Sequence, residues 1–159
     1  MVLGSWFSVM KREYPERPFV GVGAIIVEDG RVALIRRGRP PLEGEWSIPG
    51  GALELGETLR EGAVREALEE TGLTVDPQDF LGVFDRLMRD AAGQVLYHYV
   101  LVDFLCRRLG GELHAAGDSI EARWFTPKEL PGLGLAEDTA AVVRLGLQAA
   151  AKCWNSVSP

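Results

Sequence analysis

An acidic segment between Gly51 and Leu73 constrains the fold of this chain more than any other stretch. Its sequence, GALELGETLREGAVREALEETGL, holds six glutamates and two arginines and therefore carries a net charge of −4. The whole chain of 159 residues carries a formal charge of only −6. Like charges three or four positions apart on a helix repel each other. The segment is therefore either a solvated surface or a site that binds something positive.

The same segment carries the signals of a helix from about Leu59 to Thr71. Thr58 and Glu61 have the spacing of a capping box, and Gly72 is a suitable left-handed stop. The apolar residues that recur at helical spacing predict the buried stripe, namely Leu59, Ala63, Val64, Ala67 and Leu68. Three carboxylates share the other face: Glu66, Glu69 and Glu70.

Two features favour a ligand site over a solvated acidic face. Neither Glu66 nor Glu70 has a basic residue three or four positions away, and Gly50-Gly51, which precedes the helix, can offer a bare backbone carbonyl. Oxygen ligands of this kind suit Mg²⁺ or Mn²⁺ rather than zinc. Gly62, one turn before Glu66, either allows a ligand to approach closely or is a tolerated accident, and the sequence leaves both open.

The rest of the chain predicts an α/β fold with a mixed sheet and a helix on each face. Two runs rich in β-branched residues, between Phe19 and Arg37, meet at Asp29-Gly30, which is a strong hairpin signal. We expect further strands at 46–48, on both sides of a turn at Asp76-Pro77, at 94–107 and at 120–126. The terminal helix is expected over 136–154, with a stripe that consists of Ala140, Val143, Leu147 and Ala150.

Bulk composition indicates one globular domain over residues 19–159, preceded by an N-terminal extension over 1–18. The chain is 47% hydrophobic and 25% charged, and its pI near 5.0 argues against nucleic-acid binding. No apolar run is long enough to span a membrane. Cys106 and Cys153 form neither a metal pattern nor a disulfide framework, so we expect a cytoplasmic protein in which both pack as small hydrophobes.

Residues 51–73 resemble the Nudix box, GX5EX7REUXEEXGU, in which U is a bulky aliphatic residue. Five residues separate Gly51 from Glu57, and seven more precede Arg65-Glu66. The remainder, 67–73, supplies the paired glutamates, the glycine and the final aliphatic residue, with Ala67 as the one departure. The flanking stretches VGVGAIIVEDGRVALIRRGRP, GEWSIPGG and IEARWFTPKEL are also similar to Nudix hydrolases, so the resemblance covers roughly residues 19–143.

The resemblance implies a Nudix fold, an α/β/α sandwich around a mixed sheet. It implies hydrolysis of a nucleoside diphosphate linked to another moiety X, by attack of water on phosphorus with Mg²⁺ or Mn²⁺ present. By the same resemblance the metal ligands are Glu66, Glu69, Glu70 and the Gly51 carbonyl. Glu57 and Arg65 match the structural ion pair of the family.

Several residues remain candidates for catalysis and substrate binding. Nudix hydrolases differ in the carboxylate that takes the proton from water, and the candidates here are Glu69, Glu70 and Glu121. A basic cluster of Arg36, Arg37 and Arg39 suits phosphate, although strand alternation puts the first two on opposite faces. Trp46 either holds a base or fills the core, and the core is favoured.

The identity of X is less constrained. The proline that many ADP-ribose hydrolases carry after the box is absent, because Met88 and Arg89 occupy its expected place. The sequence motifs typical of the Nudix hydrolases that cleave NADH or coenzyme A are absent too. The loop over 36–51 still favours ADP-ribose or a related nucleotide sugar. The alternatives are a nucleoside triphosphate pyrophosphohydrolase and, in another class, a non-catalytic nucleotide sensor. We also expect a homodimer formed through residues 1–18.

Overall fold

The computed structural model describes residues 11–154. Its first two strands form the expected hairpin. β1 (Phe19–Glu28) and β2 (Arg31–Arg37) run antiparallel and are joined by Asp29 and Gly30. These two residues have φ values of 49° and 71°. A two-residue hairpin turn of type I′ requires positive φ at both positions, and the Asp-Gly pair tolerates them. The predicted hairpin is therefore confirmed.

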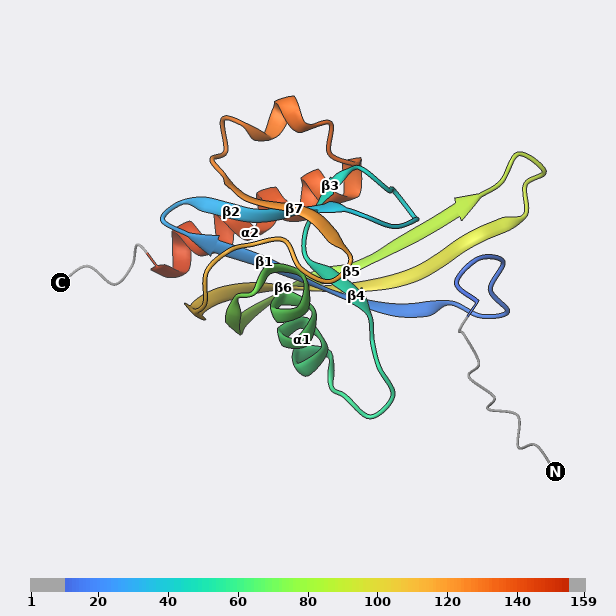
Figure 1. Cartoon of the computed structure of the whole chain (residues 1–159), viewed down its shortest axis with the longest axis horizontal. Coiled ribbons are helices and arrows are strands. Elements are labelled where there is room, and N and C mark those ends of the chain that lie inside the picture. The colour runs from blue at the N-terminus through green and yellow to red at the C-terminus, as the bar shows by residue number, and fades with distance from the viewer. Residues whose placement is uncertain (1–10, 155–159) are drawn as a thin grey trace.

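All strands belong to one mixed sheet (Figure 1). The remaining strands are β3 (Trp46–Ser47), β4 (Gly50–Ala52), β5 (Thr74–Arg89), β6 (Val95–Gly110) and β7 (Ser119–Phe125). The main order is β3-β2-β1-β6-β5, while β4 pairs with β1 and β7 pairs with β2. Among the strand pairs of residues 11–154, β1 with β6 is the only parallel one. β6 is apolar along most of its length because it lies centrally, between β1 and β5.

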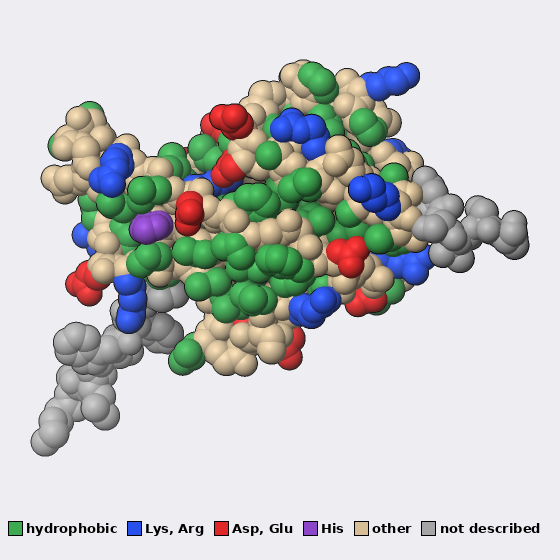
Figure 2. Space-filling view, turned by 180° about the vertical axis from the view of Figure 1, so that it is seen from behind, with side chains coloured by type: hydrophobic (Ala, Val, Ile, Leu, Met, Phe, Trp, Pro, Cys, Tyr) green, Lys and Arg blue, Asp and Glu red, His purple; other side chains and the backbone are tan. Residues whose placement is uncertain are grey.

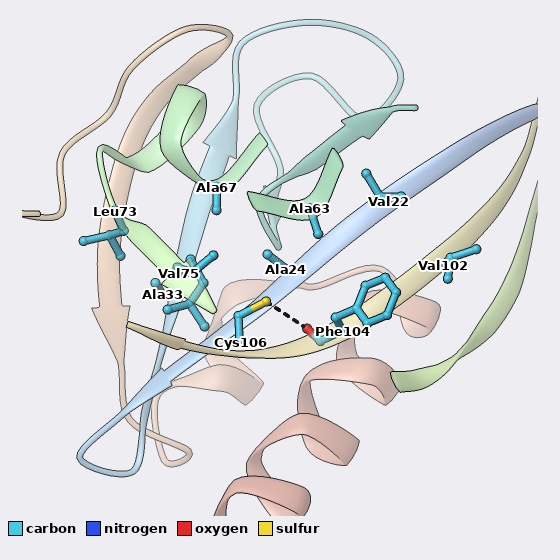
Figure 3. Packing of buried hydrophobic residues seen from close by; sticks show 11 residues of the cluster. Val22, Ala24, Ala33, Ala63, Ala67, Leu73, Val75, Val102, Phe104 and Cys106 are labelled. Atoms are coloured by element: carbon cyan, nitrogen blue, oxygen red, sulfur yellow. Dashed lines mark hydrogen bonds between the residues drawn. The ribbon is translucent and has the colours of Figure 1, made fainter. Parts of the chain in front are cut away.

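The two helices cover opposite faces of the sheet (Figure 1). α1 (Leu59–Thr71) packs on the face that carries Val22 and Ala24, and Figure 3 shows Ala63 and Ala67 of the helix in the same cluster as these strand residues. α2 (Glu137–Trp154) follows a short 3-10 helix, η1 (Leu130–Leu133), and packs on the face that carries Ile25. Because β1 is covered on both sides, its residues from 21 to 27 are all buried. This is the expected α/β/α sandwich.

The predicted turn at Asp76-Pro77 is wrong. Both residues lie within β5, which is a continuous strand of 16 residues. Pro77 pairs with Cys106, and the register shifts between Pro77 and Asp79. β5 is the last strand of the main order, and an edge strand tolerates a residue that lacks an N–H donor. The proline therefore produces an irregularity in the ladder rather than the end of the strand.

The buried stripes of both helices are rotated from their predicted positions. On α1, Leu59 and Leu68 are exposed at 36% and 51%, while Glu70 is buried. The residues that α1 buries are Gly62, Ala63, Ala67, Glu70 and Thr71. On α2, the buried set is Thr139, Val142, Val143, Gly146 and Ala150, so only Val143 and Ala150 of the predicted stripe are fully buried. Small side chains let both helices approach the sheet closely, which outweighs the burial of larger leucines.

Residues 11–18 of the expected extension lie along the hairpin formed by β5 and β6. The backbone N–H of Tyr14 donates to Leu96 O at 2.9 Å, and the Tyr97 hydroxyl donates to Glu13 Oε1 at 2.6 Å. Residues 1–10, on which the dimer expectation mainly depends, lie outside the described range. Viewed from behind, hydrophobic side chains are spread across the middle of the surface (Figure 2).

Within residues 11–154, no helix is both long and apolar enough to cross a membrane. Both cysteines are free thiols. Cys106 is buried in the core, as predicted, and burial raises its pKa to about 12. Cys153 is exposed instead, near the end of α2.

Candidate active site

One cavity of about 570 Å³ brings the acidic helix and the glycine loop together. At one end it is lined by Gly50 and Gly51 of β4 and by the carboxylates of α1. The other end lies on the α2 face of the sheet, where β5, β6 and the start of α2 meet. This volume falls within the usual range for small-molecule sites.

The three α1 carboxylates that were expected as ligands all line this cavity, but their surroundings differ. Glu70 is buried at 7% exposure, and its Oε2 accepts a hydrogen bond from the backbone N–H of Gly50 at 2.9 Å. Burial raises the pKa of Glu70 to about 7. Burial also raises the pKa of Glu66, whereas Glu69 is largely exposed. Two carboxylates are thus held in a place that disfavours their charge.

Arg65 ties these carboxylates to the preceding loop. Its Nε and Nη2 donate to the two oxygens of Glu57 at 3.0 and 2.6 Å, so the pair is bidentate. Its Nη1 donates to Glu66 at 2.6 Å and to Glu69 at 3.1 Å. The hydrogen bond from Arg65 lowers the pKa of Glu57, and Glu57 in turn raises the pKa of Arg65. The arrangement is the ion pair that the sequence resemblance implies, extended by two further carboxylates.

Glycines set how closely the loop approaches the helix. A side chain at Gly62 would contact Glu57 Oε1 at 2.9 Å and Leu53 Cδ1 at 3.0 Å. Gly62 therefore makes room for the loop. This role differs from both interpretations of the sequence, namely close approach of a ligand and a tolerated accident. At Gly51 the space that a side chain would occupy is filled by the carboxylate of Glu66. Larger residues at these two positions would push the loop away from the carboxylates.

The basic cluster divides as strand alternation suggests. Arg37 and Arg39 line the cavity, while Arg36 lies outside it. Arg37 is largely buried, and burial lowers its pKa. Its Nε donates to Pro41 O at 2.7 Å, and among the described residues no hydrogen bond engages its Nη nitrogens. Arg39 is exposed and pairs with Asp118 at 3.1 Å.

Trp46 and Glu121, like Arg36 and Glu57, are not part of the cavity lining. Trp46 packs edge-on against Phe125, with ring centroids 4.8 Å apart, and belongs to the α2-side core. Glu121 faces Arg36 at 3.8 Å, and both side chains are over 40% exposed. Trp46 belongs to β3, which reaches the cavity through Ser47, and none of the described residues of β7, the strand that carries Glu121, is part of the lining.

The donor set at the α1 end fits a hard divalent cation. Its carboxylate and backbone oxygens are the ligands that Mg²⁺ and Mn²⁺ prefer. The raised pKa values of Glu66 and Glu70 mark a place where added positive charge would compensate for lost solvation. Across residues 11–154, no three acidic, histidine or cysteine side chains already enclose a common point. Arg65 instead bridges Glu66 and Glu69.

Sequence reasoning missed several residues at the other end of the cavity. Asp103 of β6, Arg86 of β5 and Asp138 of α2 all line it, as does Arg12 from the expected N-terminal extension. One signal could have revealed Asp103, because it is the single acid within the apolar run YVLVDFLC of a central strand. The other three are charged residues of ordinary appearance, and only the fold brings them together.

Comparisons with known proteins agree with this geometry. Residues 17–145 match the family described as the NUDIX domain. A protein of Methanocaldococcus jannaschii named ADP-ribose pyrophosphatase is 40% identical over 116 residues, which is 73% of this chain and 66% of that protein. The human protein named 8-oxo-dGDP phosphatase NUDT18 is 32% identical over 134 residues, 82% of this chain and 39% of that protein. The chain thus spans less than two thirds of the length of these curated relatives.

Solved structures show the same fold. The crystal structure of a MutT NUDIX hydrolase from Burkholderia pseudomallei superimposes with a TM-score of 0.71 at 32% identity. That match covers 82% of this chain and 98% of the other.

Proposed function

The chain belongs to the NUDIX family, and from this premise we propose that it hydrolyses the diphosphate bond of a nucleoside diphosphate linked to another group. The proposed substrates are ADP-ribose or related nucleotide sugars, and the proposed cofactor is Mg²⁺ or Mn²⁺. The observation that carries the proposal is the position of Glu66, Glu70 and Arg37 in one cavity. Two carboxylates with raised pKa values and an arginine with unengaged Nη nitrogens share this space.

The roles follow from the contacts of each residue. Glu66, Glu69, Glu70 and the Gly51 carbonyl would hold the cation, which when bound neutralises phosphate charge and lowers the pKa of a water. Arg37 offers its Nη nitrogens to phosphate oxygens, for which a guanidinium is well shaped. Arg65 positions the site, because its bonds to Glu57 and to Ala52 O fix the loop beside the helix.

The proton of the attacking water goes to a carboxylate of α1 in this proposal. Among the three candidates, Glu69 and Glu70 line the cavity, and Glu121 does not. Glu70 is held in place by the backbone N–H of Gly50 at 2.9 Å, whereas Glu69 is the more exposed. Replacing each by glutamine separately distinguishes them, since the base should show the larger loss of kcat.

ADP-ribose is favoured because of both the cavity and the relatives. The cavity has room on the far side of the carboxylates for a ring system, with Phe84 and Tyr99 in its wall. The Methanocaldococcus relative bears the name ADP-ribose pyrophosphatase. Cleavage of ADP-ribose at the diphosphate yields AMP and ribose 5-phosphate. We further propose a cytoplasmic location, for which the two free thiols are the support.

A second candidate function is the removal of phosphate or pyrophosphate from nucleoside di- or triphosphates. The human relative named 8-oxo-dGDP phosphatase favours this alternative. A non-catalytic nucleotide sensor is the third, and the complete set of α1 carboxylates speaks against it. A screen of nucleotides with Mg²⁺ or Mn²⁺, with products identified by mass, tests the proposal. We expect two monophosphates from ADP-ribose; pyrophosphate from triphosphates with ADP-ribose left intact would support the second function instead.

A further inference from the structure

Asp103 is the least expected charged residue of the cavity. It lies in the middle of β6 with an exposure of only 4%, yet it lines the cavity wall. Glycines face it on both neighbouring strands, since Gly23 of β1 and Gly82 of β5 are its register partners. The carboxylate occupies the space that a side chain at Gly23 would take. Gly23 therefore leaves the space in the sheet that the Asp103 side chain occupies.

The carboxylate of Asp103 has no hydrogen-bond donor from the described part of the chain. Arg86, the nearest cation, is engaged elsewhere, because its Nε and Nη2 donate to Asp138 Oδ2 at 2.9 and 2.6 Å. Asp138 is satisfied by this pair and by the backbone N–H of Thr139 at 2.7 Å. Among the described residues, no fully buried side-chain oxygen or nitrogen lacks a partner, so the unbonded Asp103 oxygens are open to the cavity, where a ligand can reach them.

The wall around Asp103 suits a flat ring. Tyr99 and Leu101 precede Asp103 on β6, and Phe84 lies on the neighbouring strand β5. Val142 of α2 and Ile35 of β2 complete the lining. Aromatic and aliphatic side chains of this kind pack on the faces of a heterocycle, while a few polar groups read its edge. Asp103 is the carboxylate in this wall to which the described residues supply no hydrogen-bond donor, whereas Asp138 is paired with Arg86.

We propose that Asp103 is a specificity-determining residue that accepts a hydrogen bond from the exocyclic amino group of the nucleotide's base. The inference rests on the proposed function only in taking a nucleotide as the ligand of the cavity. A base such as uracil fits less well, because its ring N–H is flanked by two carbonyl oxygens. One of these would face the second carboxylate oxygen of Asp103. Cytosine, adenine and guanine all carry an amino group, and the inference commits to the two purines because the names of the relatives refer to ADP-ribose and 8-oxo-dGDP.

Two matched pairs of nucleoside monophosphates test the proposal by equilibrium binding in the presence of Mg²⁺. The adenine pair is AMP and purine riboside 5′-monophosphate, which lacks the 6-amino group. The guanine pair is GMP and IMP, which lacks the 2-amino group. A hydrogen bond to a charged acceptor corresponds to a preference of on the order of tenfold or more. We expect this preference in one pair, which identifies the base.

Variants of Asp103 assign the preference to this residue. Asp103→Ala should bring the amino-bearing nucleotide down to the affinity of its partner, and Asp103→Leu serves if the alanine variant does not fold. Asp103→Asn keeps an acceptor oxygen and should restore part of the preference. The matched control is Asp85→Ala on β5, whose side chain is exposed on the other face of the sheet. It should leave the preference unchanged.

Three results would overturn the inference: no preference within either pair, a preference that survives Asp103→Ala or Asp103→Leu, or a preference lost equally in Asp85→Ala. Hydrolysis of ADP-ribose is a separate readout. If ADP-ribose is not cleaved while the Asp103-dependent preference is present, the proposed reaction fails and the inference stands. If ADP-ribose is cleaved and no preference is found, the reverse holds.

Discussion

The carboxylate of Glu70 accepts a hydrogen bond from the backbone N–H of Gly50 at 2.9 Å. This bond joins the last turn of α1 to β4, the strand that leads into the loop, so the acidic helix and the glycine pair form one unit. It also explains why α1 turns a glutamate rather than Leu68 toward the protein. The same hydrogen bond therefore sets the rotation of α1 and holds Glu70 at the cavity.

Replacing Glu70 with glutamine should abolish most activity and leave the fold intact. The amide oxygen of glutamine can still accept the bond from Gly50, but it carries no charge for a cation and takes no proton. We expect kcat to fall by about 100-fold or more. Near-normal turnover in a folded Glu70→Gln protein would remove Glu70 from the site. Glu43→Gln, on an exposed loop, is the control that should change nothing.

Arg65→Ala should destabilise the protein and impair catalysis together. The change leaves Glu57 and Glu66 without their common partner and frees the loop from the helix. We expect a loss of about 1–3 kcal/mol in the free energy of unfolding, measured by urea denaturation. Arg144→Ala, on the exposed side of α2, should stay within about 0.5 kcal/mol of the parent protein. Equal denaturation midpoints for the two variants would argue against the positioning role of Arg65.

The stability of the metal-free protein should depend on pH through Asp103. Burial raises the pKa of Asp103 in the folded state to about 7, well above the ordinary value near 4. Between these values the folded state keeps a proton that the unfolded state has lost. The contribution of Asp103 to stability therefore falls as pH rises from about 4 to about 7, and it is constant above that.

The Asp103→Asn variant isolates this contribution, because the amide does not titrate. The difference in unfolding free energy between variant and parent should change with pH by up to about 1.4 kcal/mol per unit within this window. Urea denaturation at a series of pH values in chelator gives this difference. Parallel curves for the two proteins would show that Asp103 does not titrate differently in the folded state.

A homodimer is expected from the apolar residues of the N-terminal segment, which include Trp6 and Phe7. Sedimentation equilibrium of the full chain should give twice the monomer mass, and deletion of residues 1–10 should shift the protein toward monomer. A full chain that sediments as a monomer at concentrations where activity is unchanged would refute this expectation.

Local signals predicted much of the fold. The Asp-Gly turn, the capping box at Thr58 and the left-handed stop at Gly72 are each set by neighbours in sequence, and all three are present. The break predicted at Pro77 failed because its outcome depends on whether the strand lies at an edge, which is a tertiary property. The stripe on α1 failed for a related reason, since a bond to Gly50 outweighed the burial of leucine.

Sequence reasoning predicted the residues of the candidate site within 51–73 but not those on β5, β6 and α2. The residues within 51–73 lie close together along the chain, so spacing alone related them to one another. Asp103, Arg86 and Asp138 come from three separate elements, and no periodicity connects them. The role of Trp46 could not be decided from the sequence for another reason. A tryptophan near Gly50-Gly51 can either contact a nucleotide base or pack in the core, and Trp46 packs against the core on the α2 side.

Hydrolysis of ADP-ribose in water enriched with ¹⁸O tests the central claim most directly. With Mg²⁺ or Mn²⁺ present, we predict equal amounts of AMP and ribose 5-phosphate, with one ¹⁸O atom in the phosphate of one product and none in the phosphate of the other. Excess chelator should stop the reaction, because the carboxylates of α1 then have no cation to hold. The account would be contradicted by undiminished cleavage in chelator, by products that carry no ¹⁸O in either phosphate, or by no cleavage with either metal.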